Sequence, residues 1–202
     1  MKIMLDCSPA KIMEYRKRYD FDFWQLRTPL TCYARAEGIP YGLDNGCFKE
    51  FRRKEWERLV YEAQSDKPIF VTLPDIVGDA QRTIELFDHF RWHTQGLPRA
   101  LVLQDGVERT RLDWYLFDAI FIGGTDEFKI SKEAMNAAKV AKILGKWVHV
   151  GRVNTAKRVR NWVGLADSID GSGISRYDHM LEDVLMEIQG QHPQSKLVEF
   201  DK

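Results

Sequence analysis

Short runs of consecutive apolar residues recur along this chain, and amphipathic segments separate most of them. Unbroken hydrophobicity, as in Ala119-Ile120-Phe121-Ile122, is typical of parallel strands that are covered on both faces. The last predicted strand, residues 168–169, is assigned from its position in the alternation of strands and helices more than from its hydrophobic pattern. The strands are predicted at residues 2–5, 23–26, 41–43, 69–73, 100–103, 119–122, 147–150 and 168–169.

Helical periodicity fills most of the intervals between these runs. Residues 54–64 carry Trp56, Leu59 and Val60 on one helical face. Another helix follows Ser131, a preferred N-cap residue, and ends at Gly145. The helices are predicted at residues 54–64, 80–92, 131–145, 155–163 and 176–188.

Alternation of eight strands with helices predicts an α/β fold, and specifically a compact (β/α)₈ TIM barrel. The chain has 202 residues, which is near the lower limit for such a barrel, so its loops must be short. No linker or low-complexity segment interrupts the pattern, and we expect one domain over residues 1–202. Six or seven strands instead of eight would give the alternative, an open doubly wound parallel sheet.

Composition narrows the class of protein. Thirty basic and thirty acidic residues give a formal net charge of zero, so no global field attracts nucleic acid or anionic lipid, although a local patch still can. No apolar segment approaches the roughly 18 residues of a membrane span, and the N-terminal apolar run is too short for a signal peptide. The three cysteines are widely spaced and form no CxxC pair. We therefore expect a cytoplasmic protein without disulfides or a cysteine-rich zinc site.

Acidic residues follow several of the predicted strands. Asp44, Asp75 and Asp170 stand at strand ends, and Asp105 and Asp167 lie close by. An isolated aspartate at such a place can cap a helix or form an Asx-turn. Their recurrence favours convergence on one pocket, because a (β/α)₈ barrel builds its active site at the C-terminal ends of its strands. Two such carboxylates can act as nucleophile and as acid or base at a sugar carbon.

Other strand-end residues are suited to binding a planar heterocycle. Gln104 both donates and accepts hydrogen bonds, as reading a base edge requires, although a single glutamine can also be structural. Gly123-Gly124 permits close approach of the backbone to a ligand, or simply a tight turn. Phe48 can stack on a base or belong to the core.

A locally basic stretch, residues 151–160, opens a helix after a predicted strand. Barrels often bind phosphate near their last strands, and helix N-termini attract it, although a solvated basic helix face would have the same composition. The neighbouring glycine-rich loop, residues 171–175, is a second place for phosphate. The candidate phosphate or nucleic-acid ligands are Arg152, Lys157, Arg158 and Ser172.

A metal site is not expected. His89 and His93 stand four residues apart, but their helix offers no third ligand. His149 lies inside a predicted strand, either as a core residue with a hydrogen-bond partner or as a donor to the pocket. The sequence contains no P-loop, no GxGxxG and no GxSxG motif.

In order and spacing, these signatures resemble the tRNA-guanine transglycosylase superfamily, including its DNA-directed relatives that insert 7-deazaguanine bases. Asp44-Asn45-Gly46-Cys47-Phe48 resembles the family's Asp-Ser-Gly-Gly-aromatic motif, which implies proton transfer by Asp44 and base stacking by Phe48. Asp75 and Gln104 match base-reading residues of the family. Gly123-Gly124 matches the turn whose backbone contacts the base.

Asp167-Ser168-Ile169-Asp170 resembles the family's Asp-x-x-Asp motif, in which the second aspartate is the nucleophile. The resemblance implies that Asp170 attacks C1′, expels the resident base and holds a covalent glycosyl-enzyme until an incoming base attacks C1′. It spans roughly residues 40–175 and implies no metal or redox cofactor. The partners implied are a nucleic acid and a free 7-deazaguanine-type base, and a homodimer is one assembly left open.

Departures from the family refine the expectation. No cysteine follows Asp170, so we expect no zinc subdomain of the kind that the family uses with tRNA, and DNA is favoured over tRNA as the substrate. Residues 125–129 read Thr-Asp-Glu-Phe-Lys where the family has Leu-Ala-Val-Gly-Glu. The compact size fits an enzyme of a phage or mobile element. The alternatives are an N-glycosidase or base-exchange enzyme acting on free nucleosides or nucleotides, a tRNA-directed transglycosylase, and a non-catalytic module that binds a base or nucleic acid.

Overall fold

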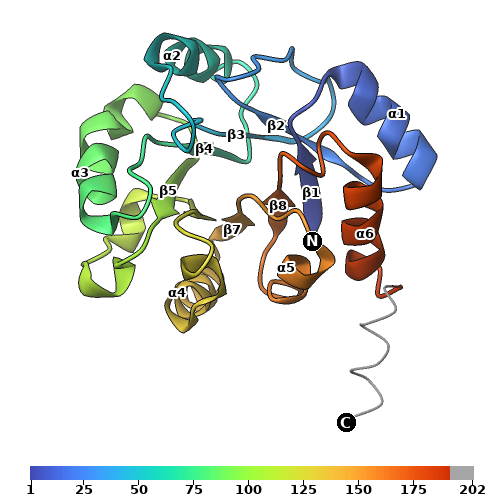
Figure 1. Cartoon of the computed structure of the whole chain (residues 1–202). Coiled ribbons are helices and arrows are strands. Elements are labelled where there is room, and N and C mark those ends of the chain that lie inside the picture. The colour runs from blue at the N-terminus through green and yellow to red at the C-terminus, as the bar shows by residue number, and fades with distance from the viewer. Residues whose placement is uncertain (192–202) are drawn as a thin grey trace, which may run out of the picture.

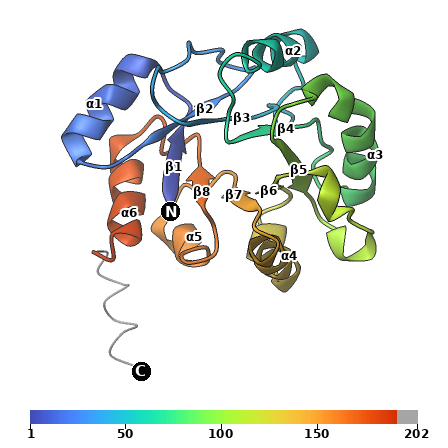
Figure 2. The same ribbon diagram turned by 180° about the vertical axis from the view of Figure 1, so that it is seen from behind.

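The computed structural model describes residues 1–191, and its eight parallel strands close into a barrel in chain order (Figures 1 and 2). Closure comes from β8, which pairs with β1 in the register Lys2↔Ser168. This confirms the (β/α)₈ prediction, and the open doubly wound sheet is wrong. Residues 192–202 of the predicted domain lie outside the described residues. The strands are β1 Lys2–Leu5, β2 Trp24–Arg27, β3 Tyr41–Leu43, β4 Phe70–Thr72, β5 Arg99–Leu103, β6 Ala119–Ile122, β7 Trp147–Val150 and β8 Ser168–Asp170.

All the predicted strands are present, with bounds within one residue of the prediction at either end. The α-helices pack around the outside of the barrel (Figures 1 and 2). They are α1 Pro9–Tyr19, α2 Arg53–Glu62, α3 Ala80–Phe90, α4 Lys132–Ile143, α5 Ala156–Arg160 and α6 Asp178–Ile188. No α-helix joins β2 to β3, and two short 3₁₀ helices, Val107–Arg109 and Trp114–Leu116, join β5 to β6. These reduced connections are how a chain of this length completes the barrel.

Helix α1 was not predicted from the sequence, although its start is encoded there. The Ser8 side chain accepts a hydrogen bond from the backbone N–H of Lys11, and Pro9 occupies the first turn, where no N–H is needed. Only Ile12 and Tyr15 are buried, so the apolar face is too narrow to stand out. The prediction for residues 155–163 was too long, because α5 ends at Arg160.

Two layers of apolar side chains stabilise the barrel. Residues that point outward from the strands, such as Ile3 and Ile120, pack under the helices. Residues at the alternate positions form a separate interior cluster, composed of Met4, Trp24, Leu26, Phe70, Ala100, Val102, Ala119 and Phe121. Gly42 of β3 must lack a side chain, because a Cβ there would lie 2.5 Å from the ring of Phe70. These side chains fill the middle of the barrel.

Within residues 1–191, no helix is both long enough and apolar enough to cross a bilayer.

Candidate active site

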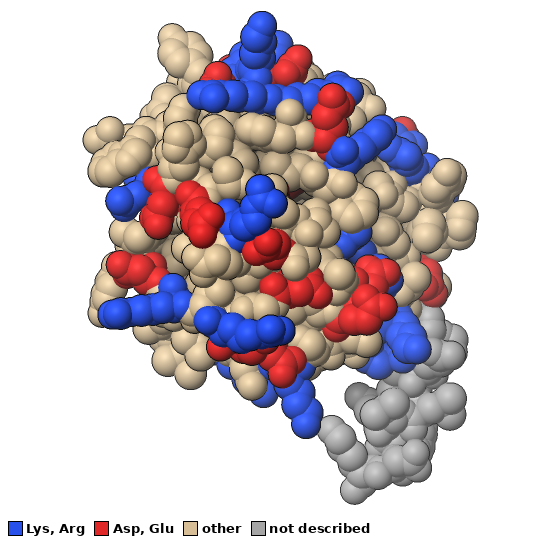
Figure 3. All heavy atoms as spheres, turned by 60° about the vertical axis from the view of Figure 1, so that its left-hand side comes forward, with Lys and Arg blue, Asp and Glu red and all other residues tan. Residues whose placement is uncertain are grey.

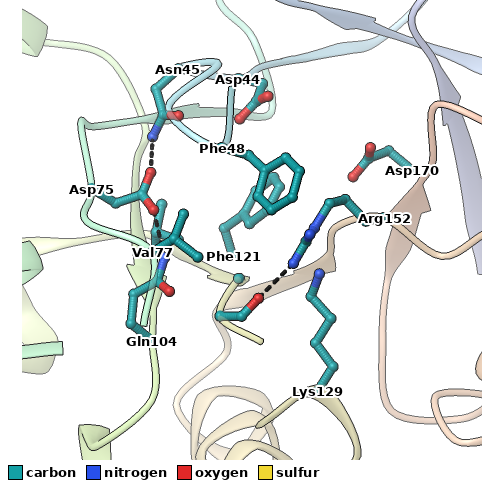
Figure 4. A pocket seen from close by; sticks show the side chains of 13 residues that line it. Asp44, Asn45, Phe48, Asp75, Val77, Gln104, Phe121, Lys129, Arg152 and Asp170 are labelled. Atoms are coloured by element: carbon teal, nitrogen blue, oxygen red, sulfur yellow. Dashed lines mark hydrogen bonds between the residues drawn. The ribbon is translucent and has the colours of Figure 1, made fainter. Parts of the chain in front are cut away.

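A pocket of about 70 Å³ opens where the C-terminal ends of the strands meet (Figure 4). Strand alternation explains why polar residues reach it. Gly42, Val102 and Ser168 point into the barrel, so the residues two positions later, Asp44, Gln104 and Asp170, point the same way, beyond the apolar interior. Eight of the predicted site residues line this pocket: Asp44, Phe48, Asp75, Gln104, Gly123, Gly124, Arg152 and Asp170.

Asp75 and Gln104 form a fixed pair on one wall of the pocket (Figure 4). Gln104 donates from Nε2 to Asp75 Oδ2 at 2.5 Å and accepts from the backbone N–H of Gly78 at 2.9 Å. Asn45 donates to Asp75 Oδ1 at 2.7 Å and to the Leu73 carbonyl at 2.6 Å. These bonds hold both side chains in place before a ligand arrives. Burial raises the pKa of Asp75 to about 6, against the lowering effect of its hydrogen bonds.

Asp44 faces two other carboxylates across the pocket. Burial raises its pKa to about 7, and the negative charges of Asp170 and Asp75 add to the rise. Thr72 Oγ1 lies 3.4 Å from Asp44 Oδ1. A carboxyl group that titrates near neutral pH can both give and take a proton, as a general acid–base catalyst must.

Asp170 is oriented by a chain of hydrogen bonds inside the barrel. Trp147 Nε1 donates to Ser168 Oγ at 2.9 Å, and Ser168 Oγ lies 2.8 Å from His149 Nδ1. The serine oxygen already accepts from the indole, so its O–H is assigned as the donor to His149 Nδ1. The proton of the imidazole then lies on Nε2, which donates to Asp170 Oδ1 at 3.0 Å. Among the described residues, Asp170 Oδ2 accepts no hydrogen bond and remains available on the pocket side.

Phe48 and Arg152 cover the mouth of the pocket (Figure 4). The guanidinium carbon of Arg152 lies 3.7 Å from the centre of the Phe48 ring, and Nη2 donates to the Gly124 carbonyl at 2.6 Å. Phe48 is 62% exposed, so it is not a core residue. Arg152 has a φ of 61°, an unfavourable left-handed conformation that its contacts must hold. Because Arg152 covers one face of the Phe48 ring, this contact has to open before a base can stack on that face.

The Gly123-Gly124 turn fits closely against the pocket. A Cβ on Gly123 would lie 2.6 Å from Val102 Cγ1 and 2.9 Å from Gln104 Nε2. Gly124 has a φ of 72°, which other residues rarely adopt. The carboxylate of Asp105 accepts from the backbone N–H of Thr125 at 2.9 Å and from its hydroxyl at 2.6 Å. Asp105 therefore anchors this turn and does not line the pocket.

Asp167 is turned away from the site. It forms an ion pair with Lys142 at 2.6 Å and accepts from the backbone N–H of Val148 at 2.8 Å, at the start of β8. Its role is to hold α4 and β7 to β8. The two aspartates of the 167–170 motif thus lie in different environments: Asp170 lines the pocket, and Asp167 does not.

The remaining predicted phosphate ligands lie outside the pocket. Lys157 and Ser172 are exposed, and Arg158 forms an ion pair with Asp126 and donates to the Arg152 carbonyl at 3.3 Å. On the face shown in Figure 3, basic and acidic side chains are interspersed without an extended patch of one sign. Arg158 thus braces Arg152 in this structure.

Lys129 also lines the pocket, although no sequence pattern predicts it there. It belongs to the 3₁₀ helix Phe128–Ile130, is only 5% exposed, and extends toward Arg152 (Figure 4). Its Nζ has no hydrogen-bond partner among the described residues. Burial and the charge of Arg152 lower its pKa to about 7. A lysine after a strand normally suggests a solvated side chain, so only the folded turn reveals it.

No group of three or more His, Cys, Asp or Glu residues within residues 1–191 is arranged to hold a metal ion. His93 lies outside the barrel, with Nε2 3.7 Å from Glu57, and neither it nor His89 lines the pocket.

Comparison with known proteins adds no functional assignment to this geometry. A scan of protein-family models and a search of curated proteins each gave no match. Among solved structures, the chain is similar to one described as "Structural study of Project ID from Aquifex aeolicus VF5", with 16% sequence identity and a TM-score of 0.42. The alignment covers 91% of this chain and 67% of the Aquifex chain. The chemistry of the pocket must therefore be derived from its own residues.

Proposed function

We propose that this protein is a base-exchanging glycosyltransferase that replaces guanine with a 7-deazaguanine-type base in DNA through a covalent Asp170–glycosyl intermediate. One observation carries the proposal. A single pocket combines a pre-oriented carboxylate–amide pair, Asp75 and Gln104, with two further carboxylates in unlike environments, Asp44 and Asp170. The first pair suits recognition of a base, and the second pair suits displacement at a sugar carbon.

Recognition follows from the hydrogen-bonding capacity of the fixed pair. The Asp75 carboxylate retains lone pairs that can accept from the N1–H and the 2-amino group of a guanine-type base. The second N–H of the Gln104 amide can donate to O6 of the same base. Phe48 stacks on the ring once it parts from Arg152, and Phe121 and Val102 supply apolar surface in the pocket.

The exchange takes place in two displacements. Asp170 Oδ2 attacks C1′ of the deoxyribose, the C1′–N9 bond breaks, and its electron pair leaves with the guanine, which takes a proton from Asp44. The incoming base then attacks C1′ through N9 and gives its N9 proton to the Asp44 carboxylate, and the C1′–O bond to Asp170 breaks. His149 keeps Oδ1 engaged throughout, so Oδ2 is the attacking oxygen. The enzyme returns to its starting protonation state.

DNA as the substrate rests on the resemblance to the DNA-directed members of the superfamily. A guanine in a duplex has to flip out of the stack to reach this pocket, at a cost of a few kcal/mol. Arg152 at the pocket mouth and exposed Lys157 nearby can contact the flanking phosphates. Base exchange or N-glycoside hydrolysis on free nucleosides is the second candidate. The zero net charge and the Arg158–Asp126 ion pair favour it, because they leave little free positive charge for a polymer.

The experiment that tests the proposal presents several substrates to the purified protein. Duplex DNA, single-stranded DNA, tRNA and guanosine are each incubated with 7-cyano-7-deazaguanine, digested to nucleosides and examined by mass spectrometry. We expect the 7-deazaguanine deoxynucleoside in the DNA digests, its loss in Asp170→Asn, and its retention in Asp20→Asn, the same change at an exposed residue. Modified nucleoside from guanosine alone would support the second candidate, and no exchange on any substrate would reject both.

A further inference from the structure

Lys129 is a buried amine in the pocket that the displacement at Asp170 does not use. Its side chain is 5% exposed, and its Nζ finds no hydrogen-bond acceptor among residues 1–191. Two carboxylates act on it through their charges, but both are engaged elsewhere. Asp126 pairs with Arg158. Asp170 accepts from His149. An ammonium group without acceptors is costly to bury, so this position favours a neutral amine.

The surroundings of Lys129 also favour the neutral form. A second cavity of about 10 Å³ beside the side chain is lined in part by buried apolar residues, Val150, Val153 and Trp162. On the pocket side, the lysine extends toward the guanidinium of Arg152 (Figure 4). Burial and this positive charge lower the pKa of Lys129 to about 7, against the opposing charges of Asp170 and Asp126. A desolvated lysine beside another cation is the form in which proteins use this amine as a nucleophile toward carbonyl carbons.

We propose that Lys129 forms a Schiff base with an aldehyde in the pocket, and that this aldehyde is C1′ of an abasic deoxyribose in DNA. The inference rests on the proposed function, which brings C1′ to Asp170 in the pocket that Lys129 also lines. When no incoming base arrives, water attacks C1′ in its place. Asp44 takes a proton from the water, and the C1′–O bond to Asp170 breaks with its electron pair returning to the carboxylate. The released 2-deoxyribose then opens to an aldehyde at C1′.

Capture of this aldehyde by Lys129 needs no oxidant, reductant or further reactant. The Nζ lone pair forms a bond to C1′, the carbonyl π pair moves to the oxygen, and one N–H proton moves to the same oxygen. The hydroxyl group then leaves as water with the second N–H proton, which gives a C1′=Nζ double bond. The charge of Asp170 already acts on Lys129, so it also stabilises the protonated imine. The protein thereby retains a sugar whose base has been lost.

Reductive trapping with abasic DNA tests this assignment without requiring base exchange. The wild type is mixed at pH 7 with a duplex that contains one abasic site, in the presence of sodium cyanoborohydride, which reduces an imine to a stable amine. Denaturing electrophoresis measures the cross-linked protein, and peptide mass spectrometry locates the bond. We expect the bond at Lys129, and only in samples that contain the reductant, because an unreduced imine hydrolyses on denaturation.

Two lysine variants and a second aldehyde control the experiment. Lys129→Met should give at least about tenfold less cross-link, whereas Lys132→Met, at an exposed lysine of α4, should match the wild type. Because the bond is located in the wild type, the result does not depend on how well Lys129→Met folds. A parallel reaction with 2-deoxyribose 5-phosphate separates DNA from a small sugar as the source of the aldehyde. Labelling of Lys129 by the free sugar alone would overturn the assignment to abasic DNA.

Failure of this inference can be told apart from failure of the proposed function. Absence of a cross-link, or a cross-link confined to other residues, would overturn the role of Lys129. Base exchange measured on the same preparation would then leave the proposed function intact. A cross-link at Lys129 in a preparation that exchanges no base on any substrate would support aldehyde capture and reject the exchange. If neither is observed, both proposals fail.

Discussion

Replacement of Asp44 by asparagine should stabilise the protein at alkaline pH relative to the wild type. Burial raises the pKa of Asp44 from 3.8 to about 7, and the negative charges of Asp170 and Asp75 add to the rise. A carboxyl group whose pKa is higher in the folded state binds its proton more tightly there. It therefore contributes stability that is fully present below its unfolded pKa and is lost as the pH rises through its folded pKa.

The pKa values set the size and the range of this effect. At a pH between the unfolded-state pKa of 3.8 and the native-state pKa of about 7, Asp44 keeps a proton in the native protein that the unfolded chain has released. The free energy of unfolding therefore falls by about 1.36 kcal/mol per pH unit in this range. Asp44 titrates at about 7 in the native state, so the wild type should lose about 2–3 kcal/mol relative to Asp44→Asn between pH 5 and pH 8. Asp75 and Asp6 also have raised pKa values, but they are present in both proteins and largely cancel in the difference.

Urea unfolding followed by tryptophan fluorescence at pH 5, 6, 7 and 8 measures this difference. The free energy of unfolding of Asp44→Asn minus that of the wild type should rise steadily to pH 7 and then level off. Asp20→Asn provides the matched change at an exposed aspartate outside the pocket. A difference for Asp44→Asn that is constant across this range, or that falls with pH, would refute the reasoning.

Three other outcomes follow from the site. His149→Phe keeps an aromatic ring between Phe70 and Phe121 but removes the hydrogen bond to Asp170. The kcat for exchange should therefore fall about ten- to hundredfold, while KM for the base stays within a few-fold. An unchanged kcat would contradict the positioning role. Gly123→Ala places a methyl group against Gln104 Nε2. Calorimetry should show that this variant binds 7-deazaguanine at least about tenfold more weakly than the wild type. Retained affinity would exclude Gln104 from base recognition. DNA binding should weaken as salt rises, with a shallower dependence in Lys157→Ala, and salt-independent binding would favour the free-nucleoside candidate.

The barrel could be predicted because each strand is a short, unbroken apolar run. Runs such as Ala119–Ile122 are covered on both sides, so the pattern is continuous and easily recognised. The carboxylates that end these runs could be predicted as well, since two-residue alternation directs Asp44 and Asp170 inward. Helix α1 was missed because only Ile12 and Tyr15 mark its buried face.

The contacts that tune the site could not be predicted from the sequence. His149 meets Asp170 because β7 and β8 pair in the register His149↔Ser168, which only the closed barrel fixes. Lys129 is buried because the chain turns sharply at Gly124 and continues into a 3₁₀ helix, whereas its neighbours in sequence suggest a solvated loop. Phe48 could be given an aromatic role, but its contact with Arg152 joins segments about a hundred residues apart. Such contacts depend on tertiary geometry, and local pattern does not encode them.

Direct detection of the intermediate tests the central claim, that Asp170 forms a covalent bond to the sugar. The protein is incubated with guanine-containing DNA without an incoming base, denatured rapidly, treated with nuclease and protease, and examined by peptide mass spectrometry. We predict a deoxyribosyl adduct on the peptide that contains Asp170, its absence in Asp170→Asn, and its disappearance when 7-cyano-7-deazaguanine is added before denaturation. An adduct on Asp44 or on another residue, or exchange that proceeds in Asp170→Asn, would contradict the account.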